Sequence, residues 1–167
     1  MELDEILKSK FSNIYIMLLY AIISRDIAKV KQFLSDDLCI KYTNQINELV
    51  KNNEIQMYDE LNVKDIYINS KEEHDDKYVV DVTLISRYMD YVIDNDTKKY
   101  KRGINDHRIE LTHHLVFEKL KTATGINGVI KCPNCGANMN INYHGKCEFC
   151  GQVIDAKTID YKLVRID

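Results

Sequence analysis

The sequence predicts an α+β fold in which N-terminal helices pack on the concave side of a long, curved antiparallel sheet. Apolar residues recur at three- and four-residue steps up to about residue 50, and from about residue 62 the period changes to two and Val, Ile and Tyr become dense. The composition, 45% hydrophobic and 29% charged with one Pro in 167 residues, is that of a globular domain. Collagen-like, disordered and disulfide-scaffold classes are therefore excluded.

A long first helix is expected from about residue 3 to 24, where it would bury a broad apolar face. The predicted stripe consists of Leu3, Ile6, Leu7, Phe11, Ile14, Leu18, Ala21 and Ile22. The segment Ser24-Arg25-Asp26 breaks this pattern. A short second helix should follow, marked by Ile27, Val30, Phe33 and Leu34.

A third helix is predicted to begin after Ser35. The Ser35 hydroxyl can cap free amides, and Asp36 and Asp37 suit the positive end of a helix. The predicted stripe of this helix is Leu38, Tyr42, Ile46, Leu49 and Val50. Cys39 lies beside the stripe, where we expect it to act as a small, mostly buried apolar side chain.

Four antiparallel strands are expected in the second part of the chain, at 62–69, 77–93, 107–120 and 158–166. An acidic turn at 71–76 and a polar tip at 94–106 would join the first three strands. The second and third strands far exceed the usual length, so a compact sheet requires a bend or bulge. Helices packed on such a curved sheet make a cone with a central cavity.

The strongest chemical signal is a pair of Cys-x-x-Cys-Gly knuckles. The four candidate metal ligands are Cys132, Cys135, Cys147 and Cys150. Two residues between paired cysteines let both thiolates face one ion, and the Gly after each pair permits a tight turn over the sulfurs. A set of four thiolates predicts one structural Zn²⁺ ion with no open position for substrate.

The donor set leaves alternatives to zinc open. Four thiolates also hold iron, and a Cys-x-x-Cys pair can act as a thiol–disulfide couple, although neither pair opens a helix in a βαβ unit. We expect zinc. Residues 131–155 would then form a zinc-ribbon insert whose core is mainly the ion, and residues 1–130 plus 156–167 would form the α+β host domain.

Four segments carry a family resemblance: the helical start that ends in Ser24-Arg25-Asp26, the strand segments 88–94 and 113–117, and the segment 160–166 after the knuckles. This combination resembles the Tim44-like domain, a family named after a matrix-side subunit of the mitochondrial inner-membrane import translocase. The family's cone fold is similar to that of nuclear transport factor two and the ketosteroid isomerases. A ribbon before the last strand resembles a bacterial subset. The resemblance implies a protein-interaction or scaffold module.

The isomerase-like relatives imply a rival use of the cone cavity, as a small-molecule site or an enzyme. Those enzymes pair a buried carboxylate base with a hydrogen-bond donor that stabilises an oxyanion. The candidate cavity residues here are Tyr88, Asp90 and His113. Strand alternation puts Tyr88 and Asp90 on one face and turns His113 and His114 to opposite faces. We favour a non-enzymatic protein and keep the cavity function as the alternative.

Charge and hydropathy bear on partners and compartment. The bases Lys98, Lys99, Lys101 and Arg102 form either a solvated tip or a small contact patch. With 23 basic and 26 acidic residues, the chain offers nucleic acid no general attraction, so we expect a protein partner, with membrane contact as a third alternative. The apolar run 14–23 is about half of what a membrane span needs, and no basic segment precedes it. We expect a cytoplasmic protein.

Overall fold

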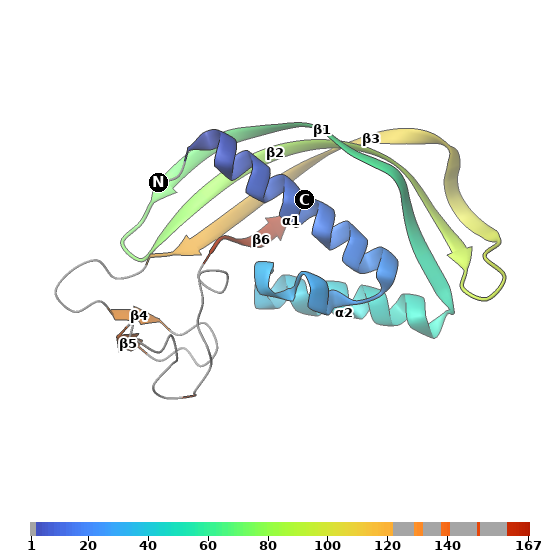
Figure 1. The fold of residues 1–167 in the computed structure, drawn as a ribbon, viewed down its shortest axis with the longest axis horizontal. Coiled ribbons are helices and arrows are strands. Elements are labelled where there is room, and N and C mark those ends of the chain that lie inside the picture. Colours follow the sequence, from blue (N-terminus) through green and yellow to red (C-terminus); the bar gives the residue numbers. More distant parts are fainter. Residues whose placement is uncertain (1–2, 122–128, 132–137, 141–149, 151–159) are drawn as a thin grey trace.

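The computed structural model describes residues 3–121, 129–131, 138–140, 150 and 160–167. Its elements are α1 (Asp4–Ser24), the 3-10 turns η1 (Ile27–Lys29) and η2 (Lys31–Phe33), α2 (Asp36–Lys51), β1 (Glu54–Glu73), β2 (Lys77–Asp94), β3 (Tyr100–Leu120), β4 (Val129–Lys131), β5 (Asn138–Asn140) and β6 (Lys162–Ile166). The strand order β1-β2-β3-β6 makes an antiparallel sheet, and both α-helices lie beneath its arch (Figure 1). The predicted α+β class is confirmed.

Helix α1 has the predicted boundaries to within one residue. Asp4 and Glu5 place negative charge in its first turn, and Arg25 ends it in the left-handed conformation (φ 56°), with its N–H donated to carbonyls of the last turn. Its buried residues are Leu7, Phe11, Ile14, Tyr15, Leu18, Leu19, Ala21 and Ile22. Leu3 and Ile6 were wrongly placed in the buried stripe: they are 72% and 48% exposed. Leu3 is the N-cap residue of α1 and Ile6 lies in its first turn, so both stand at the start of the helix, before its first buried residue, Leu7.

By its length and apolar composition alone, α1 could cross a membrane. In the structure 44% of the apolar window of α1 is buried, and core helices meet the same criterion. Phe11 stacks on Phe117 of β3 with ring centroids 4.0 Å apart, and Tyr161 meets Phe11 edge-on at 5.2 Å. Helix α1 therefore forms the centre of the core.

The predicted short second helix is wrong: η1 and η2 occupy its place. Asp26 caps η1 by accepting the N–H of Ala28 at 3.1 Å, and Val30, with φ −128°, interrupts the helical conformation between the turns. So few residues rarely sustain an α-helix. The course of the chain through this segment is instead set by the burial of two apolar side chains, Val30 and Leu34, which are 0% and 1% exposed. Leu34 also forms a parallel bridge to Leu163 of β6.

Helix α2 begins where the sequence predicts. The Ser35 hydroxyl accepts the Leu38 N–H at 3.3 Å, which confirms Ser35 as the N-cap. Four residues of the predicted stripe are buried, namely Leu38, Tyr42, Ile46 and Leu49. The fifth, Val50, is 52% exposed because it lies on the outward side of the last turn. Cys39 is half-buried and packs against the core, as expected of a small apolar side chain.

The strands are longer than the sequence predicts. Strand β1 begins at Glu54 rather than 62, and β3 begins at Tyr100 rather than 107, so the polar tip shrinks to the turn at 95–99. Bulges curve the sheet: β1 shifts register three times, and Glu60 in the first shift has φ 54°. Position 103 requires glycine, because its backbone has φ 103° and a Cβ there would lie 2.4 Å from the Asp90 carbonyl oxygen on the neighbouring strand β2.

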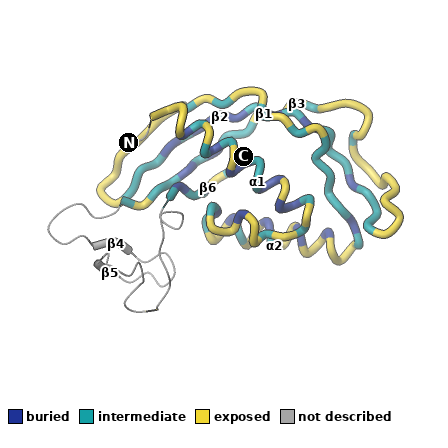
Figure 2. Tube along the Cα trace, viewed as in Figure 1, coloured by how far each residue is buried: buried dark blue, intermediate teal, exposed yellow. Residues whose placement is uncertain are grey.

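The core lies between the helices and the concave side of the sheet. Buried residues follow α1 and alternate along β2, as Figure 2 shows. On β2 the inward positions are Val80, Val82, Leu84, Ser86 and Tyr88, none more than 4% exposed. Strand β5 lies within the predicted ribbon insert 131–155, whereas β4 begins two residues before that insert. Of the last predicted strand, 158–166, residues 162–166 form β6, which pairs with β3 at residues 115–118.

Candidate functional site

The interior beneath β2 holds Tyr88, the first cavity candidate. Tyr88 is 4% exposed, and its ring meets that of Tyr58 from β1 edge-on at 5.0 Å. Beside them the Tyr15 hydroxyl of α1 lies 2.8 Å from the Ser86 hydroxyl, within hydrogen-bond distance. Burial raises the pKa of Tyr88 and of Tyr58 above its ordinary value, so both phenols stay protonated near neutral pH. Tyrosine rings fill this part of the cone.

Asp90, the second candidate, lies near Tyr88 as strand alternation predicts. It stands opposite Tyr58 in the β1–β2 register, and its charge contributes to the raised pKa of both neighbouring phenols. The Gln56 amide donates a hydrogen bond of 2.7 Å to the Asp90 carboxylate. Asp90 is half-buried and already paired, so it is held by the scaffold rather than presented to an open cavity.

His113, the third candidate, is not brought to the other two. Its register partner is Leu84, four residues before Tyr88 on β2, a separation of about 13 Å along a strand. The His113 Nδ1 lies 3.3 Å from the backbone carbonyl oxygen of Asp167, and the ring is 5.5 Å from that of Tyr15. Burial lowers the pKa of His113 below its ordinary value. The three candidates do not form one constellation.

His114 faces the convex side, as expected, and makes a contact that sequence reasoning missed. Its Nε2 lies 2.6 Å from Asp81 Oδ1, and the Asn69 amide donates to the same oxygen at 2.9 Å. Partial burial tends to raise the pKa of Asp81, but the hydrogen bonds from Asn69 and His114 outweigh burial and hold it below its ordinary value. No spacing signal in the sequence links residues 69, 81 and 114.

The basic tip is organised around a carboxylate that the sequence did not single out. Glu54, at the start of β1, is 3% exposed. Arg102 donates to both of its oxygens at 2.7 and 3.1 Å, and the Lys101 Nζ lies 2.7 Å away. The hydrogen bonds from Arg102 and then Lys101 lower the pKa of Glu54 to about 2. Two of the four tip bases, Lys101 and Arg102, are therefore paired within the fold, which leaves fewer charges for the predicted contact patch.

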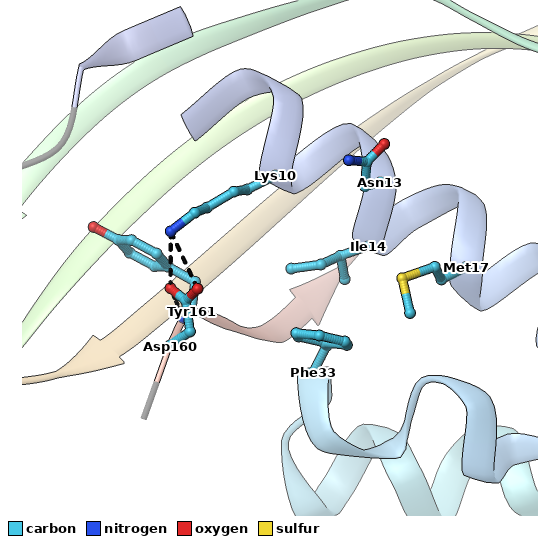
Figure 3. Close-up of a pocket in the computed structure, with 7 residues that line it drawn as sticks. All are labelled: Lys10, Asn13, Ile14, Met17, Phe33, Asp160 and Tyr161. Atoms are coloured by element: carbon cyan, nitrogen blue, oxygen red, sulfur yellow. Dashed lines mark hydrogen bonds and ion pairs between the residues drawn. The ribbon is translucent and has the colours of Figure 1, made fainter. Parts of the chain in front are cut away.

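A pocket of about 220 Å³ opens between α1, η2 and the chain before β6. Figure 3 shows its lining residues: Lys10, Asn13, Ile14, Met17, Phe33, Asp160 and Tyr161. Most of the wall is apolar. At one end the Lys10 ammonium contacts the Asp160 carboxylate at 3.1 and 3.3 Å. Pattern reasoning missed this pocket because its walls come from segments far apart in the chain.

Three of the four predicted metal ligands, Cys132, Cys135 and Cys147, lie outside the described residues. Cys150 is described and exposed. Among the described residues no group of three or more His, Cys, Asp or Glu side chains is arranged to hold a metal. The structure of the described residues therefore does not test the predicted zinc site.

The described parts define a helix-covered α+β cone with a packed interior. The chain belongs to the Tim44-like domain family, whose family model matches residues 5–127. Among solved structures it is similar to the intermembrane space region of the chloroplast protein ARC6, with a TM-score of 0.54 and 9% sequence identity, over 100% of this chain and 97% of that one. At that identity the similarity shows the fold alone. No curated protein matches the chain by sequence.

Proposed function

We propose that this protein is a non-enzymatic, zinc-binding interaction or scaffold module of the cytoplasm. In this proposal the cone provides a rigid host and a zinc ribbon, residues 131–155, presents a surface to a protein partner. Membership of the Tim44-like family supports a role in protein interaction or in a translocase-related assembly. The observation that carries the non-enzymatic part is the packing of Tyr15, Tyr58 and Tyr88 in the space where an isomerase-like site would lie.

The rival function, a small-molecule or isomerase-like site in the cone, has less support. It needs a carboxylate and a donor that face a ligand-sized space. Tyr88 is almost fully buried, Asp90 is paired with Gln56, and His113 lies too far along the sheet. Substitution of Asp90 by Asn should therefore leave any biological activity of the protein intact, and loss of a ligand from the D90N variant would favour the rival.

The chemistry of the cysteine set fits zinc. Cys132, Cys135, Cys147 and Cys150 supply four soft ligands in two matched pairs, the set that structural zinc sites use. Such a site contributes folding free energy rather than catalysis, because no coordination position is left for substrate. The ion would order the ribbon, and the host domain would keep its own apolar core.

Elemental analysis of the purified full chain tests the metal. We expect about one zinc per chain, lost in Cys135→Ser and kept in the matched control Cys39→Ser, whose thiol packs against the helical core. Chelation should leave the helical circular dichroism unchanged because α1 packs on the sheet through buried apolar side chains such as Leu7, Phe11 and Phe117. Stoichiometric iron with visible absorbance, or a cooperative loss of all secondary structure on chelation, would contradict the proposal.

Affinity capture from the protein's own cell extract tests the scaffold role. A partner that binds the native chain and Cys39→Ser but not Cys135→Ser would support a partner surface on the ribbon.

The third function, membrane attachment through the tip, predicts salt-sensitive liposome binding that is lost when Lys98 and Lys99 are changed to Glu. These two bases are chosen because Lys101 and Arg102 are paired with Glu54. Absence of liposome binding at low salt would remove this third function.

A further inference from the structure

The pocket between α1, η2 and the chain before β6 combines an apolar wall with one pair of opposite charges. Figure 3 shows Ile14, Met17 and Phe33 together on one side and the ion pair of Lys10 and Asp160 at the other end. The volume of the pocket, about 220 Å³, is below the ~300–1,000 Å³ of sites that bind drug-sized ligands. The pocket therefore suits a ligand of the size of a single amino acid.

The charged end of the pocket is held in place by the fold. The Lys10 ammonium contacts the two Asp160 oxygens at 3.3 and 3.1 Å, and the Tyr161 backbone N–H donates to Asp160 Oδ1 at 2.7 Å. Tyr161 is 2% exposed, and its ring meets that of Phe11 of α1 edge-on. The Asp160 carboxylate is therefore fixed by a residue of the core, and the ion pair joins α1 to the chain before β6.

Both charged groups reach the opening of the pocket. The side chains of Lys10 and Asp160 are 32% and 26% exposed, so each is shielded over most of its surface and still meets solvent. A carboxylate has about four positions that accept hydrogen bonds. The described contacts of Asp160, two from Lys10 and one from Tyr161, use three of them. A ligand can therefore donate to Asp160 while the ion pair stays intact.

The ion pair decides which charge a ligand should carry. A ligand with a single charge meets an attractive and a repulsive group only 3.1 Å apart, so the two interactions nearly cancel. A zwitterion avoids this cancellation when it lies antiparallel to the pair, with its ammonium at Asp160 and its carboxylate at Lys10. A ligand without charge displaces water from the ion pair and offers no polar group in return. The charged end therefore favours a zwitterion.

From the apolar wall, the volume and the ion pair, we propose that this pocket binds a free α-amino acid with an apolar side chain, such as leucine. The ammonium of the ligand donates to Asp160, and its carboxylate lies beside the Lys10 ammonium. The ligand's side chain packs against Met17 and Phe33. This site lies outside the tyrosine-filled interior of the cone, and ligand binding to it depends neither on the ribbon nor on zinc.

Methyl NMR of the full chain tests where leucine binds. In protein labelled at the methionine methyl groups, L-leucine should shift the Met17 signal, which lines the pocket, with a dissociation constant on the order of 100 µM. Met57 of β1 and Met89 of β2 lie outside the pocket lining and serve as internal controls. A Met17→Leu chain identifies the signal. Absence of a saturable Met17 shift up to about 10 mM leucine would overturn the proposal.

Two leucine analogues distinguish a zwitterion site from a site for an anion or a hydrocarbon. Leucinamide keeps the ammonium and lacks the carboxylate, whereas isocaproate keeps the carboxylate and lacks the ammonium. Each should bind at least about tenfold more weakly than leucine, because each leaves one charge of the ion pair without a counterpart. Isocaproate that binds as tightly as leucine would identify a carboxylate or acyl-chain site and would refute the zwitterion.

The variant Lys10→Met removes the ammonium and keeps the apolar stem. It should weaken leucine binding about tenfold and abolish the preference for leucine over leucinamide, whereas a purely structural role of Lys10 would weaken both ligands equally. Lys8→Met is the matched control, because Lys8 has the same 32% side-chain exposure on α1 and pairs with Glu5 instead. Unchanged leucine binding in Lys10→Met contradicts the proposal. If this variant does not fold, the analogue series on the native chain decides.

Discussion

The two ends of the main sheet are stabilised by different forces. Where α1 covers the sheet, Leu84, Leu115 and Phe117 are fully buried, and Phe117 stacks on Phe11 at 4.0 Å. At the tip, the buried carboxylate of Glu54 joins the start of β1 to two bases of β3. The same strands thus run from an apolar core to an ion-pair cluster. Apolar burial depends little on pH and salt, whereas the tip cluster depends on both.

The largest effect is expected from Phe117→Ala at the covered end. Removing a fully buried ring that stacks on Phe11 should lower the free energy of unfolding by about 3–5 kcal/mol. Urea denaturation followed by circular dichroism measures this loss. Leu120→Ala, three residues further along the same strand and 42% exposed, is the control and should cost less than about 1 kcal/mol. Equal losses for the two variants would contradict the proposed difference between the ends.

A smaller effect is expected from Glu54→Gln at the tip. The variant loses the charge-assisted bonds to Arg102 and Lys101, but both bases can be solvated by water, so we expect a loss of about 1–2 kcal/mol. Hydrogen exchange should quicken at residues 100–104 before it changes at the covered end, because the tip can open locally. Exchange that rises uniformly over the sheet would show that the two ends open together.

The pH dependence of Glu54→Gln sharpens this comparison. The folded pKa of Glu54, about 2, lies below its ordinary value of 4.5, so the unfolded chain binds a proton first as the pH falls. The stability that Glu54 contributes is therefore present in full above about pH 4.5 and is lost as the pH falls toward 2. The native chain and the variant should converge in this window. A stability difference that stays constant from pH 6 to about 2 would refute the role of the charge.

The same contrast explains which parts of the fold could be predicted from the sequence. The covered half of the sheet was predicted because its inward positions, such as Val82 and Leu84, alternate with polar ones. The first residues of β1 and β3 were missed because their inward positions carry Glu54, Gln56 and Arg102, and a period-two signal in hydrophobicity disappears when the inward side chains are polar. The helix cap at Ser35 was predicted because it depends on neighbours in the chain.

The candidate site residues likewise fall into those that a local sequence pattern predicts and those that distant segments bring together. Strand alternation placed Tyr88 and Asp90 on one face and His114 opposite to His113, because alternation is local. The pocket between Lys10, Phe33 and Asp160 could not be predicted, since its walls come from three distant segments. The cysteine spacing predicts a zinc site because the two residues between each pair of cysteines are likewise a local feature of the chain.

The smallest effects are expected from Lys101→Ala and Arg102→Ala, and their combination is more informative than either alone. Arg102 bonds both oxygens of Glu54 and Lys101 contacts one of them, so each single variant leaves the buried carboxylate with a partner. Each should cost less than about 1 kcal/mol, because both bases are more than a third exposed. The double variant leaves Glu54 without either base, and the total loss should exceed the sum of the single losses. A double-mutant cycle from urea denaturation measures this excess, and strict additivity would mean that Glu54 is solvated at the tip and that the ion-pair cluster does not hold the two strands together.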